Sequence, residues 1–544
     1  MGSSLNISNC APTGEISDGV PHPSPETSDV ALRHRACPGG LTAYAPLLAA
    51  PRALPRVVHK PAGHRGRPGG GDCLGTSPTS MCLQRRTFLG RSAGGLLGSV
   101  ALTWLNAAEQ GQLLKPHHPP KAERVVILFQ NGGPSQMDLF DPKPELVKRN
   151  GQPFPGSQKV ETLSPSASGN LLGSPFAFRP AGQSGMLLSE LLPYISSLAD
   201  DITLVRSMTT ESVCHETALR IAHSGHPLAT DRPAFGSWLT YGLGSLNRNL
   251  PAFVVLPDPG GLPINGTLNW SAGWLPAQHQ GTSFNAGDLS AAPVLNLRTP
   301  GRVPAAARTS QLELVRRLNE QHASRFPENS DLTARLQDFE TAARMQAAVP
   351  DAVDLSQETE ETRQLYGMDQ PSTQAYGMRC LLARRLLEQG VRFVGVYLKG
   401  QPWDTHADNA NATKKVAGEL DQPSAALVKD LKRRGLLDST LVVWMGEFGR
   451  TPVSQGANGR DHSRRGFSLW MAGGGMRGGY AHGATDEFGY ESVEQIVTMH
   501  DLHATLLHAI GLDHLQLTFD HDGRNETLTD ADLTQARVVH ELLS

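Results

Sequence analysis

Residues 440–450 read TLVVWMGEFGR, and this stretch decides the fold class. The run at 440–445 is apolar and rich in β-branched residues, which is typical of a buried strand. Glu447 follows at the end of that strand, where open α/β sheets place their ligands. The stretch therefore predicts an α/β sheet with a polar site at one edge.

The segments before this strand repeat the same pattern. A strand is expected at 391–398, a helix at 410–434, and then the strand at 440–445. Further upstream, we expect strands at 125–129, 202–205 and 253–256, and helices at 186–200, 217–223, 309–348 and 381–388. Helices and strands that alternate in this way indicate a largely parallel sheet.

Composition narrows the function classes. Of the 544 residues, 39% are hydrophobic and 19% are charged, as in ordinary soluble proteins. The 49 basic and 52 acidic residues nearly balance, so the chain has no overall field that would attract nucleic acid or an anionic membrane. Four of the six cysteines lie in the first 82 residues, which argues against a disulfide scaffold or a cysteine zinc module.

The beginning of the chain has a different character. Residues 1–80 are rich in Pro, Gly, Ser and Ala, and we interpret them as a disordered extension or as sequence upstream of a true start at Met81. Residues 81–108 hold Arg85 and Arg86 before a short apolar run, which is typical of a twin-arginine export signal. The alternative is a buried or membrane-anchoring helix. A linker at 109–124 and one domain at 125–544 are expected to follow.

Two clusters of aspartate and histidine are the main candidates for a site. Asp404 and His406 follow the strand at 391–398, and Asp461 and His462 lie beyond the strand at 440–445. Carboxylate oxygen and imidazole nitrogen together suit a divalent metal ion. The alternatives are a turn that caps the next helix and a surface loop. Glu447 is either a further metal ligand or the partner of Arg450.

Other polar groups have weaker claims. His215, Glu216 and His223 lie at an expected helix start that could bind phosphate or sulfate, although core or capping roles fit equally well. His500 and His503 would share one helix face, but the apolar residues around them favour packing over metal binding. Asp138 and Asp141 could supply a carboxylate or cap a helix.

Six segments together resemble one bacterial family, the domain of unknown function 1501. They are the twin-arginine signal, Asn131–Asp138, Trp403–His406, Glu447–Pro452, Gly459–His462 and Asp501–Thr505. The resemblance covers residues 121–544. It implies the alkaline phosphatase and sulfatase superfamily, and hence an alkaline-phosphatase-like three-layer sandwich with a mostly parallel central sheet.

The resemblance also implies site residues. Its metals would be held by Asp404, His406, Asp461 and His462, with Glu447 as a further candidate, and its nucleophile would lie near Ser212 to Glu216. Ser212, His215 and Ser135 are the catalytic candidates. Two departures stand out: the first strand ends in Gln130 and Asn131 instead of an aspartate, and the residues after Cys214 do not fit a formylglycine sulfatase.

These observations lead to a first hypothesis and a rival. The first is an exported, metal-dependent hydrolase of phosphate or sulfate esters that acts on a small anionic ester or a sulfated or phosphorylated glycan. Zinc, manganese, calcium and magnesium are all open as its divalent ion. The protein would reach the periplasm through the twin-arginine export machinery and could stay anchored if the signal is not cleaved. The rival is a non-catalytic, metal-bound domain that binds a glycan or a protein.

Overall fold

The computed structural model describes residues 115–155, 160–286, 304–326 and 330–544. The expected extension at 1–80, the expected export signal at 81–108 and the first part of the linker lie outside these residues. Within the described ranges, no helix has the length and apolar character needed to cross a membrane.

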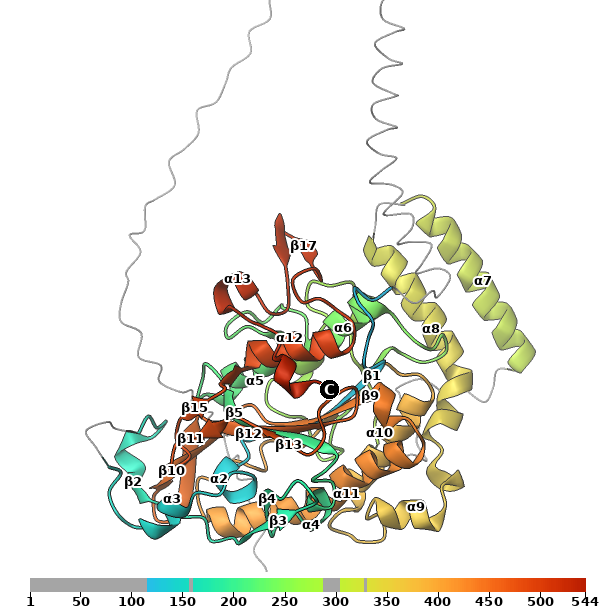
Figure 1. The fold of residues 1–544 in the computed structure, drawn as a ribbon. Coiled ribbons are helices and arrows are strands. Elements are labelled where there is room, and N and C mark those ends of the chain that lie inside the picture. Colours follow the sequence, from blue (N-terminus) through green and yellow to red (C-terminus); the bar gives the residue numbers. More distant parts are fainter. Residues whose placement is uncertain (1–114, 156–159, 287–303, 327–329) are drawn as a thin grey trace, which may run out of the picture. The chain divides into compact units, whose positions relative to one another are not determined.

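A nine-stranded sheet forms the centre of residues 115–544 (Figure 1). Its order is β13-β5-β12-β9-β1-β8-β6-β7, with β16 beside β5. Every pairing is parallel except those of β12 with β5 and with β9. The strands are β1 (Arg124–Phe129), β5 (Ile202–Thr209), β6 (Phe253–Leu256), β7 (Thr282–Ser283), β8 (Phe393–Tyr397), β9 (Thr440–Met445), β12 (Phe467–Ala472), β13 (Tyr480–His482) and β16 (Val497–Thr498).

Helices cover both faces of this sheet, which explains the continuous apolar strands. Along β1, Val126 and Leu128 face one core, while Val125 and Phe129 face the other. The first core is closed by α4 (Pro193–Ser196), α8 (Ser330–Val353), α10 (Gln374–Glu388) and α11 (Asn409–Arg433). The second is closed by α5 (His215–Ser224), α6 (Phe235–Leu243) and α12 (Met499–Ala509). The predicted α/β three-layer sandwich with a mostly parallel sheet is confirmed.

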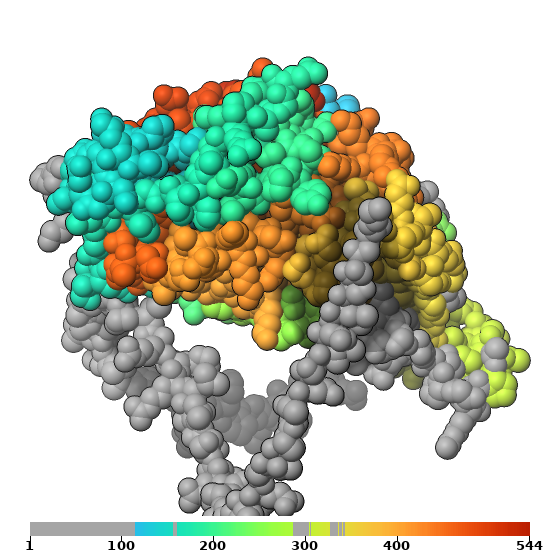
Figure 2. All heavy atoms as spheres, turned by 90° about the horizontal axis from the view of Figure 1, so that it is seen from below, coloured from blue at the N-terminus to red at the C-terminus, as the bar shows by residue number. Residues whose placement is uncertain are grey.

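Helix α11 is one of the helices that cover the first face, and its part of the chain is orange in Figure 2. It contacts the short helix α4 through a buried carboxylate. Asp421 on α11 accepts hydrogen bonds from the backbone N–H groups of Tyr194 and Ile195, both at 2.8 Å. These two N–H groups lie in the first turn of α4, where a helix has no internal acceptors. Asp421 therefore caps α4 across the helix interface.

Most predicted segments match, and one is wrong. The strands expected at 253–256 and 440–445 have the observed bounds, and the expected strand at 202–205 extends to Thr209. The helix expected at 186–200 is instead strand β4 (Met186–Ser189) followed by the single turn α4. Met186 and Leu188 of β4 pack into the core as a strand, and the proline at 193 can start a helix but not continue one.

The remaining elements are short or lie outside the central sheet. A small sheet joins β2 (Ser168–Leu171), β10 (Gly449–Gln455) and β11 (Gly459–Ser463). The others are α2 (Gln136–Leu139), α3 (Pro144–Lys148), β3 (Phe178–Ala181), α7 (Ala305–Ala323), α9 (Glu360–Leu365), β14 (Ala484–Thr485), β15 (Ser492–Glu494), β17 (Phe519–His521), β18 (Arg524–Glu526) and α13 (Ala531–Thr534).

The strand register brings several loops to one edge of the sheet. Phe129 of β1 pairs with Tyr397 of β8 and with Met445 of β9, so these three parallel strands end level. Strand β5 is antiparallel to β12, which is antiparallel to β9, so β5 runs in the same direction as the other three. The loops after all four strands therefore meet at the same edge.

Candidate metal centre

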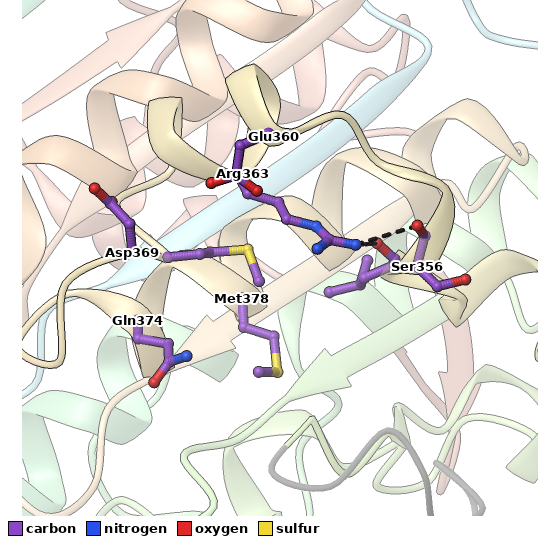
Figure 3. Close-up of a pocket in the computed structure, with 8 residues that line it drawn as sticks. Ser356, Glu360, Arg363, Asp369, Gln374 and Met378 are labelled. Carbon is purple, nitrogen blue, oxygen red and sulfur yellow. Dashed lines mark hydrogen bonds between the residues drawn. The ribbon is translucent and has the colours of Figure 1, made fainter.

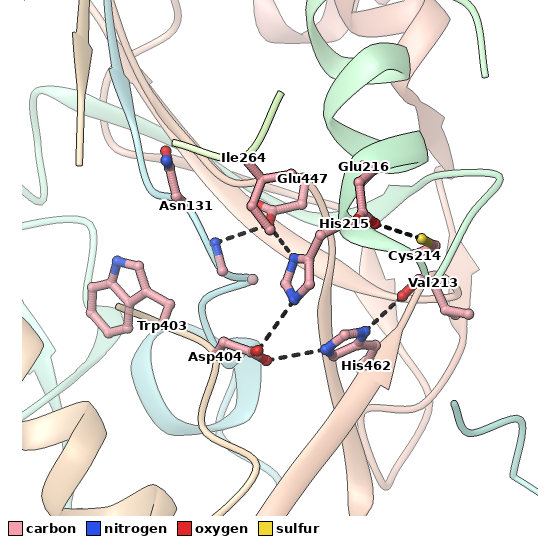
Figure 4. A network of polar contacts seen from close by, with 12 residues as sticks. Asn131, Val213, Cys214, His215, Glu216, Ile264, Trp403, Asp404, Glu447 and His462 are labelled. Atoms are coloured by element: carbon pink, nitrogen blue, oxygen red, sulfur yellow. Dashed lines mark hydrogen bonds and ion pairs between the residues drawn. The ribbon is translucent and has the colours of Figure 1, made fainter. Parts of the chain in front are cut away.

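Asp404 is the centre of the site at this edge (Figure 4). Its Oδ1 lies 3.0 Å from His406 Nε2 and 3.1 Å from His462 Nε2, and its Oδ2 lies 3.4 Å from His215 Nε2. The three histidines come from the loop after β8, from β11 and from the first residue of α5. Three segments far apart in sequence thus direct imidazole rings at one carboxylate.

The Nδ1 atom of each ring contacts an oxygen atom on the side away from Asp404. His215 Nδ1 lies 2.7 Å from Glu447 Oε1, and His462 Nδ1 lies 2.6 Å from the carbonyl oxygen of Val213. His406 Nδ1 contacts Gln455 Oε1. The partner of His462 Nδ1 is a carbonyl oxygen, which can only accept, so this Nδ1 carries the proton and the lone pair of Nε2 faces Asp404 when the ring is neutral. Three imidazole nitrogens around one carboxylate require positive charge between them, either protons or a metal ion.

The electrostatics of the cluster reflect this arrangement. Burial by itself would raise the pKa of Asp404, but contacts with the three histidines and the charge of Arg450 hold that pKa well below its usual range. Burial would lower the pKa of His215, but Asp404 and Glu447 outweigh it and raise that pKa. Burial, with the charges of Arg450 and His215, lowers the pKa of His462 to about 4. At neutral pH, His462 is therefore an uncharged imidazole, the form that binds metals.

Arg450 fixes the loops around Asp404 and has no exposed surface. Its Nη2 donates to Asp404 Oδ1 at 2.7 Å and to the carbonyl oxygens of Trp403 and Gly132. Its Nε and Nη1 donate to the carbonyl oxygens of Gly133 and Arg460 at 2.9 and 3.1 Å. The guanidinium thus joins the turn after β1, the loop after β8 and strand β11.

The turn after β1 requires glycine at position 132. Gly132 has a φ of 109°, and a Cβ there would lie 2.8 Å from the backbone nitrogen of Asp404. Its own N–H donates to Glu447 Oε1 at 2.9 Å. This contact turns Glu447 toward His215, so the carboxylate lies behind the imidazole, as in the carboxylate–histidine pairs of metal sites.

Two buried atoms beside the centre have no hydrogen-bond partner among the described residues. They are Glu447 Oε2 and His215 Nε2, whose residues are 0% and 8% exposed. Buried polar groups are seldom left without partners, and a missing ion or water is a common reason. Because Nε2 of His215 faces Asp404, its unmet lone pair fits a metal ion bound there.

The donor atoms form two overlapping groups that could hold an ion. The first is His215, Asp404 and His462, and the second is His406, Asp461 and His462. Atoms within each group lie within 4.8 Å of one another. Imidazole nitrogen and carboxylate oxygen suit zinc, manganese and related ions. All four residues predicted as ligands at 404, 406, 461 and 462 therefore lie together, and His215 joins them.

The position of Asp461 differs from the expected loop. Asp461 and His462 lie on strand β11, which pairs with β10, and both are buried. Gly459 begins this strand, and a Cβ on it would overlap the carbonyl of His406. Close packing of β11 against the loop after β8 therefore places His462 beside Asp404.

The candidate nucleophiles have other partners. The hydroxyl of Ser135 is buried and donates to Asp138 Oδ2 at 2.6 Å. Ser212 Oγ accepts from the backbone N–H of Cys214 at 3.1 Å, and Cys214 Sγ lies 2.8 Å from Glu216 Oε2. Ser212 and Cys214 lie just before α5, close in sequence to His215, whereas Ser135 points into a separate ion-pair network.

The remaining polar candidates have structural partners. Asp138 is bound by Arg460 at 2.8 Å, and Asp141 by Lys143 at 3.0 Å. The ring of His223 packs against those of Phe129 and Tyr397. His503 Nε2 is 2.9 Å from the carbonyl oxygen of Ala222, and His500 Nε2 is 2.9 Å from Glu211 Oε1. These contacts agree with the packing interpretation of α12.

A hollow elsewhere on the molecule contains none of these residues (Figure 3). Arg363 crosses it and donates to the carbonyl oxygens of Leu355 and Ser356 at 3.0 and 3.1 Å. Its lining comes from α9, α10 and the segments beside them: Leu355, Ser356, Glu360, Arg363, Met368, Asp369, Gln374 and Met378. The polar groups of this hollow do not converge on one point, in contrast to those around Asp404.

Two residues of the centre had other assignments or none. Gln455 was not considered, and His215 was named as a catalytic candidate at a helix start and not as a metal ligand. The signal for His215 was present, because it follows the end of β5 just as Asp404 follows the end of β8. Recognising it required the direction of β5, which depends on the antiparallel strand β12.

The family model described as "Protein of unknown function (DUF1501)" matches residues 122–543. The chain belongs to this family. The family resemblance predicted from the sequence is thereby confirmed. No curated protein shows significant similarity to the chain.

Solved structures with a similar fold include three enzymes or enzyme relatives. A sulfatase from a Pseudoalteromonas species is 12% identical to this DUF1501 chain, with a TM-score of 0.32. The match covers 76% of this chain and 70% of the sulfatase. A member of the alkaline phosphatase superfamily from Vibrio parahaemolyticus is 11% identical, with a TM-score of 0.32. That match covers 74% of this chain and 69% of the other. A phosphonate monoester hydrolase from Silicibacter pomeroyi is 12% identical, with a TM-score of 0.29. That match covers 64% of this chain and 72% of the hydrolase.

Proposed function

We propose that this protein is a metal-dependent hydrolase of phosphate or sulfate esters, with its divalent ion at the Asp404 cluster. The observation that supports it most is the shared orientation of three histidines. Each ring has its Nδ1 against an oxygen outside the cluster and directs its Nε2 inward at one carboxylate. Metal-binding histidines have this arrangement, because the outer acceptor fixes the tautomer and the ring.

The surroundings of the cluster suit an anionic ester. A divalent ion would polarise the ester oxygen and lower the pKa of a bound water molecule. Helix α5 begins at His215, so the positive end of its dipole lies at the cluster. Asp404 keeps 22% of its side-chain surface exposed, which leaves the cluster open to solvent. Small anionic esters and the ester groups of sulfated or phosphorylated glycans are the proposed substrates.

A second function has its own support. Of the candidate nucleophiles, Ser135 is bound to Asp138, and Ser212 accepts a backbone N–H. In the described part of the chain, the hydrogen bonds of these hydroxyls go to residues outside the histidine cluster. A metal-bound domain that binds a glycan or a protein without cleaving it would need no such nucleophile. Turnover of esters decides between the two functions.

The test uses the full chain loaded with zinc or manganese and assayed with 4-nitrophenyl phosphate, bis(4-nitrophenyl) phosphate and 4-nitrophenyl sulfate. His462→Ala is the test variant, and His322→Ala on the exposed part of α7 is the matched control. We expect turnover that falls by about 100-fold or more in His462→Ala and stays unchanged in the control. Metal binding without turnover of any ester would favour the binding domain.

We also propose export to the periplasm by the twin-arginine route, on the basis of Arg85, Arg86 and the apolar run after them. Lysine at both positions should keep the protein in the cytoplasm, whereas lysine at Arg65 should not. Fractionation of cells that express each form measures this. Unchanged export of the double variant would contradict the proposal.

A further inference from the structure

We infer that the centre binds one divalent ion, on His215, Asp404 and His462. The guanidinium of Arg450 supplies the positive charge that a second ion would otherwise bring. The inference deepens the proposed function and rests on its metal. It selects one of the two overlapping donor groups and gives Asp461 a structural role.

His462 belongs to both donor groups. Its Nδ1 donates to the carbonyl oxygen of Val213 at 2.6 Å, so only Nε2 has a free lone pair. One lone pair binds one ion. The two groups therefore cannot be filled together, and the cluster holds one ion.

The two donor groups differ in the hydrogen bonds that their ligand atoms already make. Both oxygens of Asp461 accept backbone N–H groups, Oδ1 from His462 at 2.8 Å and Oδ2 from Ser164 at 2.9 Å. Asp461 thus holds the segment at 164 against β11. His215 Nε2, by contrast, is buried and has no hydrogen bond, and Asp404 Oδ2 lies 3.4 Å from it. Among the described residues, the first group thus contains an imidazole nitrogen without a hydrogen bond, whereas both oxygens of Asp461 in the second group already accept one.

The charge of Arg450 also disfavours a second ion. Asp404 Oδ1 already contacts Arg450 Nη2 at 2.7 Å and His406 Nε2 at 3.0 Å. A guanidinium does not lose its proton in a protein, so the positive charge beside His406 is permanent. A second divalent ion on His406 would lie next to this cation in a poorly solvated site, where like charges repel strongly. Arg450 therefore takes the place that a second ion would occupy.

Arg450 acts through Asp404 and not on a substrate. Its three nitrogens all donate to buried groups of the chain, and the residue has no exposed surface. It is a positioning residue that directs Oδ2 of Asp404 toward His215 by occupying Oδ1. Lysine in its place would keep a charge but would lose the planar set of donors to three loops.

The test measures ion number with the full chain. Metal-free protein is titrated with Zn²⁺ and followed by native mass spectrometry, and Mn²⁺-loaded protein is examined by electron paramagnetic resonance. We expect one ion per chain and the spectrum of an isolated Mn²⁺. Two ions, or the spectrum of a coupled pair, would overturn the inference and leave the proposed function intact. Absence of any bound ion would overturn both.

The ligand set is tested with two variants of one cluster. His215→Ala should weaken Zn²⁺ binding by about 100-fold or more, whereas Asp461→Asn should keep one ion per chain at an affinity within about threefold of the wild type. Circular dichroism checks that each variant folds, and His215→Gln, which keeps a polar side chain, replaces His215→Ala if it does not. Loss of the ion in Asp461→Asn, with retention in the His215 variant, would overturn the assignment.

Discussion

Two aspartate–arginine pairs lie near each other and have different surroundings. Asp138 pairs with Arg460 at 2.8 Å, both residues are fully buried, and Ser135 and Asn409 also donate to Asp138. Asp404 pairs with Arg450 at 2.7 Å, but its other neighbours are three imidazole nitrogens, and its side chain is 22% exposed. The first carboxylate is satisfied by its own chain, whereas the second needs a further cation.

The Asp138 pair serves the stability of the fold, whereas Asp404 belongs to the candidate site. Burial would raise the pKa of Asp138, but the charge and hydrogen bonds of Arg460 hold that pKa below its usual range. Its role is therefore to hold the turn after β1 against β11. Asp404 has the same kind of arginine partner but retains an oxygen that faces His215. Removing the partners of each aspartate should affect different measurements.

The largest loss of stability is expected when the first pair is broken. Arg460→Met leaves the charge of Asp138 buried without a counter-ion, which costs about 3–5 kcal/mol of unfolding free energy. Urea unfolding measures this loss, and Arg460→Lys, which keeps the charge, should lose less. A loss below about 1 kcal/mol in Arg460→Met would show that the pair does not stabilise the fold.

Asp421 sharpens the comparison, because it is a buried aspartate whose hydrogen bonds come from backbone N–H groups alone. Burial raises its pKa from 3.8 to about 7, against the effect of the N–H groups of Tyr194 and Ile195. Between these pH values the folded chain holds a proton that the unfolded chain releases. Relative to Asp421→Asn, the wild type should therefore lose about 1.4 kcal/mol of stability per pH unit as the pH rises from 4 to 7. Parallel urea-unfolding profiles would contradict this.

Asp404→Asn should cost less stability than Arg460→Met. Arg450 keeps the carbonyl oxygens of Gly132, Gly133 and Trp403, and asparagine retains one acceptor oxygen. We expect a loss of about 1–2 kcal/mol in metal-free protein, measured by urea unfolding. A loss as large as that of Arg460→Met would mean that Asp404 is mainly a structural residue.

Glu447→Gln should have the smallest effect on the fold, because glutamine preserves an acceptor for the N–H of Gly132. The change weakens the contact that orients His215, and such outer partners affect metal affinity by about 10–100-fold. Calorimetric titration with Zn²⁺ measures it. Unchanged affinity would show that Glu447 does not support a metal-binding histidine.

The sequence predicted those parts of the fold that depend on local patterns. Apolar runs at 253–256 and 440–445 became strands with those bounds, because a strand covered on both faces must be apolar along its whole length. The segment at 186–200 was misjudged, because a short strand and a single turn both bury apolar residues and their spacing does not distinguish the two. Position along the strands also placed Asp404 and Glu447 near one edge.

The composition of the site depended on long-range pairing. His215 enters the cluster because β12 runs antiparallel between β5 and β9, which local patterns do not reveal. Asp461 and His462 belong to a strand because β10 turns back to pair with β11. The orientation of each of the three imidazole rings depends on one partner, Val213, Gln455 or Glu447. Each partner lies far in sequence from the ring that it contacts.

The measurement that tests the central claim most directly is the metal content of the full chain, purified from cells supplied with zinc and manganese, beside that of Asp404→Asn. Elemental analysis should find close to one ion per wild-type chain and almost none in the variant. The same low metal content in both proteins, or the same high content, would contradict a metal ion at Asp404.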